Sequence, residues 1–129
     1  MAKRVLIVDD HAPTRSLIKA MIEADRSQTF EVLETENGEG CVMTVEKDGP
    51  FDLILLDVDM PDMDGYETCR ALRKAKIETP VVFVTAKGAL KDFHEGRDAG
   101  GDSYLKKPVS RQALRSIVAL FTSIDRKKE

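Results

Sequence analysis

The stretch FDLILLDVDMP, residues 51–61, indicates the fold class of this chain. Four consecutive aliphatic residues, Leu53 to Leu56, lead directly into Asp57, and Pro61 then opens a loop. A short, unbroken apolar run bounded by turn residues is typical of a strand that is buried on both faces of a parallel sheet. Asp57 is therefore predicted to lie at the carboxyl end of a central strand, where open α/β sheets bind their ligands.

Strand and helix patterns alternate five times along the chain, which predicts an α/β fold with a parallel sheet covered by helices on both faces. Besides the stretch at 51–61, strands are predicted at 4–8, 30–35, 81–85 and 103–105. Helices are predicted on apolar residues at helical spacing, after Pro13, around Cys41, around Cys69, at 90–99 and through Leu114 to Phe121. Gly96 weakens the helix at 90–99 by about 1 kcal/mol relative to alanine. Residues 1–129 are expected to form one domain.

Composition excludes several classes of function. The net charge of −3 and the pI of about 5.5 argue against a nucleic-acid-binding surface, which is normally basic. No apolar stretch approaches the roughly 18 residues that a membrane span needs. The two cysteines, Cys41 and Cys69, lack the spacing of a metal site, so we interpret them as buried thiols of a cytoplasmic protein. Neither a nucleic acid nor a membrane is expected as a partner.

Chemically useful side chains follow four of the predicted strands. These are Asp9 and Asp10, Asp57, Thr85 and Lys107. The carboxyl ends of parallel strands lie at one edge of a sheet, so these side chains should converge. Alone, Asp9 or Asp10 would be interpreted as a helix cap. Together, three carboxylates repel one another unless a hard cation such as Mg²⁺ joins them, while lysine and threonine suit phosphoryl oxygens. The pattern predicts an aspartyl phosphate site.

With these residues the chain resembles the receiver domain of two-component response regulators, of the chemotaxis-regulator type, from Lys3 to about Ile124. The resemblance implies a flavodoxin-like, doubly wound (βα)5 fold with five parallel strands in the order 2-1-3-4-5. The motifs that carry it are Asp9-Asp10, Asp57-Val58-Asp59-Met60-Pro61, Asp64-Gly65, Thr85-Ala86, Ala99-Gly100 and Tyr104-Leu105-Lys106-Lys107-Pro108.

The resemblance also implies a role for each site residue. Asp57 is expected to be the phosphoacceptor. The carboxylates of Asp9, Asp10 and Asp57 and the backbone carbonyl of Asp59 are expected to hold Mg²⁺, with Mn²⁺ able to substitute.

Further residues are expected to act on the phosphoryl group or to respond to it. Thr85 and Lys107 should contact its oxygens, and Tyr104 should change rotamer together with Thr85. The Lys107–Pro108 bond is expected to be cis, a form that only X-Pro bonds adopt readily. Asp59 and Lys87 are expected to tune the lifetime of the phosphoryl group, either as an ion pair over the pocket or as two solvated side chains.

The implied function is that of a signalling phosphoacceptor, not an enzyme beyond weak self-phosphorylation and self-dephosphorylation. Its donor would be a sensor histidine kinase or a histidine phosphotransfer protein. Its downstream target would bind the face made by the helix at 90–99, the strand at 103–105 and the last helix. The chain would act alone or as the receiver part of a longer regulator.

Two alternatives use some of the same residues. In a phosphatase of the haloacid dehalogenase type, Asp57 and Asp59 would be the nucleophile and the acid, although that motif usually follows the first strand. A flavin-binding flavodoxin is disfavoured by the acidic loop that begins at Asp9.

Overall fold

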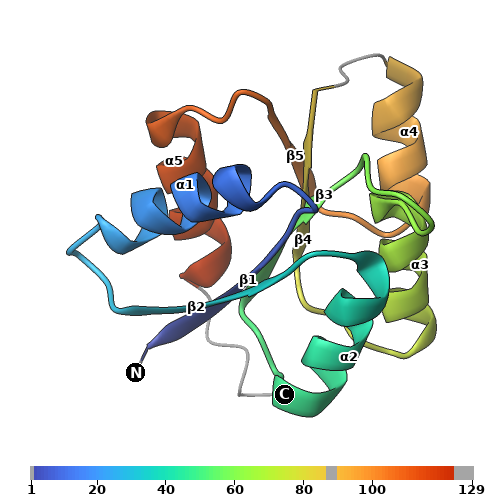
Figure 1. Ribbon diagram of the computed structural model, residues 1–129, viewed down its shortest axis with the longest axis horizontal. Helices are drawn as coiled ribbons and strands as arrows, with labels where there is room; N and C mark the ends of the chain where they lie inside the picture. Colours follow the sequence, from blue (N-terminus) through green and yellow to red (C-terminus); the bar gives the residue numbers. More distant parts are fainter. Residues whose placement is uncertain (1, 87–89, 124–129) are drawn as a thin grey trace.

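The computed structural model describes residues 2–86 and 90–123 as alternating strands and helices (Figure 1). The strands are β1 (Lys3–Val8), β2 (Phe30–Thr35), β3 (Leu53–Asp57), β4 (Val81–Thr85) and β5 (Ser103–Lys106). The helices are α1 (Ala12–Glu23), α2 (Gly38–Asp48), α3 (Gly65–Lys74), α4 (Leu90–Asp98) and α5 (Arg111–Thr122). Within the described ranges, none of these helices combines the length and the apolar composition that a membrane crossing requires.

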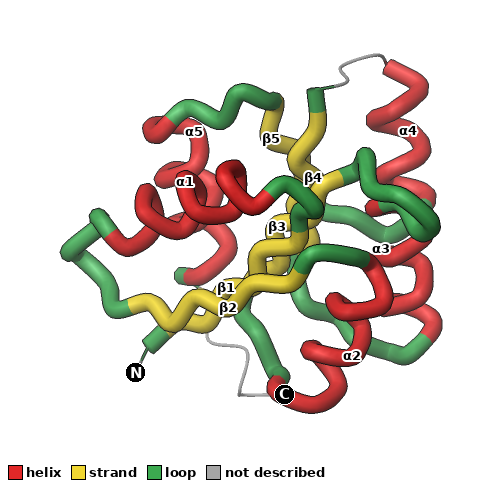
Figure 2. The backbone as a smooth tube through the Cα atoms, viewed as in Figure 1, coloured by secondary structure: helices red, strands yellow, loops and turns green. Residues whose placement is uncertain are grey.

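The five strands form one parallel sheet in the order β2-β1-β3-β4-β5, which confirms the predicted topology (Figure 2). The register aligns the carboxyl ends of the inner strands. Val8 pairs with Leu56, and Asp57 pairs with Val84 on the next strand. Thr85, the last residue of β4, pairs with Lys106 at the end of β5. The residues that follow β1, β3, β4 and β5 therefore lie along one edge of the sheet.

Two apolar layers bury this sheet, as the unbroken run of β3 predicted. All five residues of β3 and all five of β4 are buried. Leu53 and Leu55 pack with α1 and α5, while Ile54 and Leu56 pack with α2 and α3. Figure 1 shows the same division, with α1 and α5 on one face of the sheet and the other helices on the opposite face. Side chains that alternate along a strand reach both layers, so β3 must be apolar throughout.

The helix starts explain why the acids after β1 are available for chemistry. Helix α1 has His11 at its N-cap and a proline in its first turn, and the His11 side chain makes no capping hydrogen bond. Neither Asp9 nor Asp10 therefore caps α1. Elsewhere the caps are conventional: Asp64 and Glu67 form a capping box at α3, and Ser110 caps α5.

Helix α4, which Gly96 is expected to weaken, buries little apolar surface through the side chains that the structure describes. Phe93 is the only large apolar residue among those α4 side chains that the structure describes, and it is 44% exposed. Few buried apolar contacts mean that such a helix opens or shifts at low free energy.

Arg73, near the end of α3, joins the loop that precedes β4 to the loop that precedes β5. Its guanidinium donates hydrogen bonds to the carbonyl oxygens of Ile77 at 2.9 Å, Thr79 at 2.8 Å and Gly100 at 3.0 Å. It also pairs with the Asp102 carboxylate at 3.2 Å. Gly100 has a φ of 97°, and an added Cβ there would lie 2.8 Å from Arg73 Cγ, so a glycine is needed for this close approach.

Replacement of Arg73 by alanine should lower the free energy of unfolding by about 2–3 kcal/mol, because three partly buried carbonyls lose a charged donor. The matched control is Arg70→Ala on the same helix, which removes one exposed ion pair with Glu95 and should change stability by less than about 0.5 kcal/mol. Urea unfolding followed by circular dichroism measures both. Equal losses would show that Arg73 does not join the two loops.

Candidate functional site

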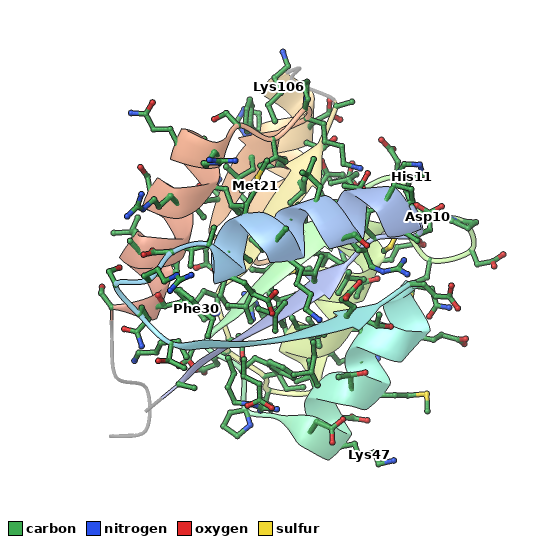
Figure 3. The ribbon with its side chains drawn as sticks, turned by 60° about the vertical axis from the view of Figure 1, so that its left-hand side comes forward. Asp10, His11, Met21, Phe30, Lys47 and Lys106 are labelled. Carbon is green, nitrogen blue, oxygen red and sulfur yellow. The ribbon has the colours of Figure 1, made fainter. Side chains whose placement is uncertain are left out.

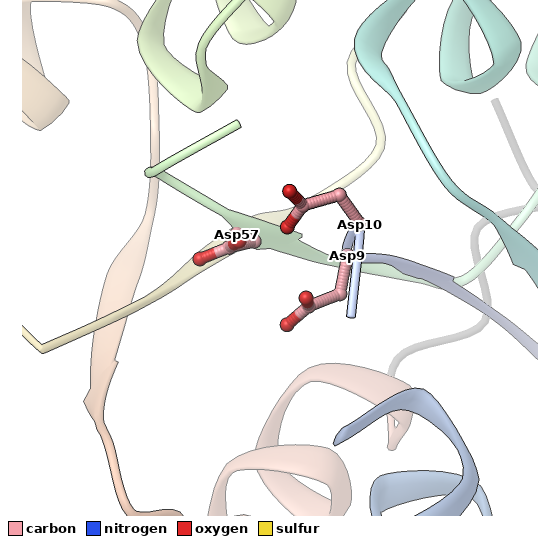
Figure 4. A group of neighbouring side chains, drawn as sticks. All are labelled: Asp9, Asp10 and Asp57. Atoms are coloured by element: carbon pink, nitrogen blue, oxygen red, sulfur yellow. The ribbon is translucent and has the colours of Figure 1, made fainter. Parts of the chain in front are cut away.

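Three carboxylates meet at the carboxyl edge of the sheet, as predicted. One oxygen from each of Asp9, Asp10 and Asp57 lies within 4.8 Å of the others. Figure 4 shows the three side chains converging from the ends of β1 and β3. Asp9 and Asp57 are each only 2% exposed, whereas Asp10 is exposed and lies beside His11 at the start of α1 (Figure 3). Two acids are therefore buried, with a third at the surface beside them.

Lys107 supplies the nearest positive charge. Its Nζ lies 3.1 Å from Asp57 Oδ1 and 3.1 Å from Asp9 Oδ2, so one ammonium bridges the two buried acids. Its backbone N–H donates to the carbonyl oxygen of Thr85 at 2.8 Å, which fixes the lysine beside the end of β4. The Lys107–Pro108 bond is cis, as expected. A second cis bond, Gly49–Pro50, was not predicted.

The pKa values report an excess of negative charge. Burial and, next in size, the neighbouring Asp9 charge raise the pKa of Asp57, Lys107 offsets only part of this shift, and the resulting pKa is about 6. Burial alone would lower the pKa of Lys107, but its hydrogen bond to Asp57 and the negative charges of Asp57 and Asp9 outweigh this and raise it. One lysine thus does not balance the buried carboxylates.

The donor set fits a hard divalent cation. Asp9 Oδ1 accepts a hydrogen bond from the His11 N–H at 2.9 Å. Asp9 Oδ2 is buried and accepts no hydrogen bond, because its 3.1 Å contact with Lys107 is a charge contact without hydrogen-bond alignment. A buried oxygen with unused acceptor capacity, close to two further carboxylates, is the kind of all-oxygen site that Mg²⁺ prefers.

The other predicted site residues do not belong to the group of three carboxylates. Thr85 is buried at the end of β4, and Asp59 is exposed in the loop after β3. Lys87 lies outside the described residues, and so does its predicted pairing with Asp59. Tyr104 belongs to a different cluster, since its hydroxyl contacts the Tyr66 hydroxyl and the Asp92 carbonyl beneath α4.

Sequence analysis did not identify Tyr66 or Gly96 as neighbours of Tyr104. In the sequence, Gly96 stands out only as a weak point of the helix at 90–99. The available signal was chemical: a buried tyrosine needs a hydrogen-bond partner for its hydroxyl. Helical spacing cannot show which partner that is.

The Asp57→Asn variant should be more stable than the wild type at pH 8 in EDTA, by about 3 kcal/mol. The pKa of Asp57 is raised from its ordinary value of 3.8 to about 6, so ionised Asp57 destabilises the fold above pH 6. This penalty decreases as the pH falls through 6 and is absent below about 4, where the carboxyl is protonated in both states. Urea unfolding at pH 8 and pH 4 measures the difference. An equal gain at both pH values would contradict the electrostatic explanation.

Comparison with known proteins agrees with this geometry. Residues 5–119 match the family model of the response regulator receiver domain. The chain is 38% identical over 119 residues to the two-component response regulator ORR41 of Oryza sativa subsp. japonica, covering 92% of this chain and 93% of ORR41. It is 37% identical over 119 residues to the transcriptional regulatory protein ResD of Bacillus subtilis (strain 168), covering 92% of this chain. The chain spans about half of ResD, 48% of its length.

A solved structure shows the same fold. The receiver domain of sensor histidine kinase PA1611 from Pseudomonas aeruginosa PAO1, which has a magnesium ion coordinated in its active site cleft, superposes with a TM-score of 0.84. It is 26% identical to this chain, and the match covers 96% of this chain and 100% of that one.

The comparisons give no support to a phosphatase of the haloacid dehalogenase type. The family model covers most of the chain, and the ORR41 relative matches it over nearly its whole length. The chain therefore belongs to the response regulator receiver domains, the phosphoacceptor domains of two-component signalling.

Proposed function

We propose that Asp57 is the phosphoacceptor of this receiver and takes its phosphoryl group from a phosphohistidine. The observation that carries the proposal is the position of the Asp57 carboxylate. It is buried at the end of the central strand, 3.1 Å from the Lys107 ammonium and close to two further acids. A carboxylate in that setting is held in place and partly neutralised, as covalent phosphoryl transfer requires.

Asp57, Lys107 and Thr85 have separate proposed roles in the transfer. An oxygen of Asp57 attacks phosphorus, a P–O bond forms, the P–N bond of the donor breaks, and its electron pair stays on the donor imidazole. Lys107 Nζ lies where it can pair with a phosphoryl oxygen on Asp57. The Thr85 hydroxyl, at the end of the adjacent strand, is the second proposed donor to the phosphoryl oxygens.

Asp9, Asp10 and Asp57, with the backbone carbonyl of Asp59, are the proposed ligands of Mg²⁺, or of Mn²⁺ in its place. A bound ion there supplies positive charge that offsets the repulsion between the carboxylates and the phosphoryl oxygens. The three carboxylate oxygens within 4.8 Å support this set, as does the magnesium ion in the PA1611 receiver domain.

The wider role follows from the family. We propose that residues 1–129 form one receiver domain, with a sensor histidine kinase or a histidine phosphotransfer protein as donor. Its target would bind the surface of α4, β5 and α5, which Thr85 and Tyr104 would switch. The proposed activity is limited to self-phosphorylation and self-dephosphorylation, without turnover of other substrates. A cytoplasmic location, without nucleic-acid or membrane partners, stays a prediction.

Acetyl phosphate with Mg²⁺ should add one phosphoryl group to the wild-type protein and none to Asp57→Ala, because, of the two buried acids, Asp57 is the one that accepts a hydrogen bond from Lys107. Intact-mass spectrometry measures the gain. Two controls should still be labelled: Asp62→Ala, which removes an exposed acid of the following loop, and Thr85→Ala, which keeps the nucleophile. Labelling of Asp57→Ala at the wild-type level would contradict the assignment.

A further inference from the structure

Tyr104 lies in an aromatic cluster beneath α4. Its ring centroid is 5.3 Å from that of Phe83 on β4 and 4.6 Å from that of Phe93 on α4. Tyr66 of α3 joins the cluster, with its ring centroid 5.0 Å from that of Phe83 in an edge-on arrangement. The elements α3, β4 and α4 therefore surround the Tyr104 ring with aromatic side chains that make apolar and edge-on contacts.

The hydroxyl groups of the cluster form a chain. Tyr66 Oη lies 3.0 Å from Tyr104 Oη, and both hydroxyls can reach the carbonyl oxygen of Asp92. Each hydroxyl has one proton to donate, so only two of these three contacts can be hydrogen bonds. The shortest contact joins Tyr104 to the carbonyl, so Tyr104 donates to Asp92 and Tyr66 donates to Tyr104. Hydrogen bonds in such a chain strengthen one another.

Gly96 provides the space for this arrangement. A Cβ at residue 96 would lie 2.1 Å from Tyr104 Oη, 2.7 Å from Cζ and 2.9 Å from Cε1. Glycine is otherwise unfavourable inside a helix. The atoms in conflict belong to the far end of a side chain, so an alanine at residue 96 would displace the tyrosine ring and leave the helix backbone intact.

Tyr104 also shapes the adjoining surface. It lines a surface pocket of about 350 Å³ between α4 and β5. The other lining residues are Phe93, Arg97, Gly101, Asp102 and Ser103. A Tyr104 ring that left its place beneath α4 would change this pocket.

We infer that Tyr66 and Gly96 are positioning residues that hold Tyr104 beneath α4 and so set the shape of the α4–β5 surface. The Tyr66 hydroxyl holds Tyr104 from the side of α3, and the missing side chain at residue 96 leaves it room. None of these contacts involves Asp9, Asp10 or Asp57. The consequence for output rests on the proposed function, whereas the contacts themselves do not.

The test uses the two tyrosines of this chain. In Tyr66→Phe, every tyrosine signal comes from Tyr104, so ¹³C labelling of tyrosine rings reports its position directly by NMR. We call the Tyr104 ring inward when it lies beneath α4 and outward when it has left that position. Loss of the Tyr66 donor should lower the ratio of inward to outward rings by about 2- to 10-fold. The ring-current shifts from Phe83 and Phe93 should shrink, and broadening by a soluble paramagnetic agent should increase.

A second variant, Gly96→Ala, should move Tyr104 outward further than Tyr66→Phe does, while circular dichroism shows unchanged helix content. His94→Ala is the control, since His94 is an exposed α4 residue whose ring contacts Arg97. It should leave the Tyr104 signals in place. Unchanged Tyr104 shifts and protection in Tyr66→Phe would overturn the inference, whatever Gly96→Ala does.

Labelling by acetyl phosphate separates this inference from the proposed function. Both variants keep Asp57 and its neighbours, so both should be labelled at the wild-type level. Failure of the wild type to be labelled would count against the phosphoacceptor role alone. A Tyr104 ring that stays inward in Tyr66→Phe would count against the positioning role alone.

Discussion

Two buried carboxylates, Asp9 and Asp57, share a single lysine at the carboxyl edge of the sheet, and the rest of the site depends on this imbalance. Burial of a charge is unfavourable unless partners compensate it. Lys107 compensates part of it, and the raised pKa of Asp57 records what is left. Additional positive charge, from a divalent cation held with Asp10, would relieve the remaining repulsion. The repulsion between the carboxylates destabilises the site by itself, and a bound cation would remove that repulsion. Such a site is suited to couple cation binding to phosphoryl transfer.

The parallel register also connects the acidic site to the α4–β5 surface. It aligns the end of β3 with the ends of β4 and β5, so that Asp57, Thr85 and Lys107 share one edge. From the same strand β5, Tyr104 reaches the underside of α4, the helix with the fewest apolar anchors among the described side chains. Lys107 and Tyr104 thus connect the acidic site and the α4–β5 surface through four residues of chain. A well-packed sheet with a weakly packed helix beside it allows a change at one edge to alter a surface without unfolding the core.

Much of this arrangement was predictable from local patterns. The apolar run before Asp57 predicted a doubly buried strand, and the alternation of elements placed Asp9, Thr85 and Lys107 at one edge. The strand order came from the resemblance to receiver domains. The cluster around Tyr104 was not predictable, because Tyr66 is 38 residues from Tyr104 in sequence and no periodicity links them. The role of Gly96 was not predictable for the same reason. The sequence shows its low helix propensity, but only the fold shows that the Tyr104 ring occupies the space beside it.

The most direct measurement of the charge imbalance is paramagnetic broadening of backbone amide signals during titration with Mn²⁺. Amides next to Asp9, Asp10 and Asp57 should broaden at the lowest Mn²⁺ concentration, and Asp57→Asn should require more Mn²⁺ for the same effect. A competing position lies in the adjoining surface groove of about 460 Å³, which Asp10 lines together with Glu36, Glu39 and Asp62. If the amides of Glu36, Glu39 and Asp62 broaden before those next to Asp9 and Asp57, or if Asp57→Asn leaves the titration unchanged, the buried carboxylates are not the cation site.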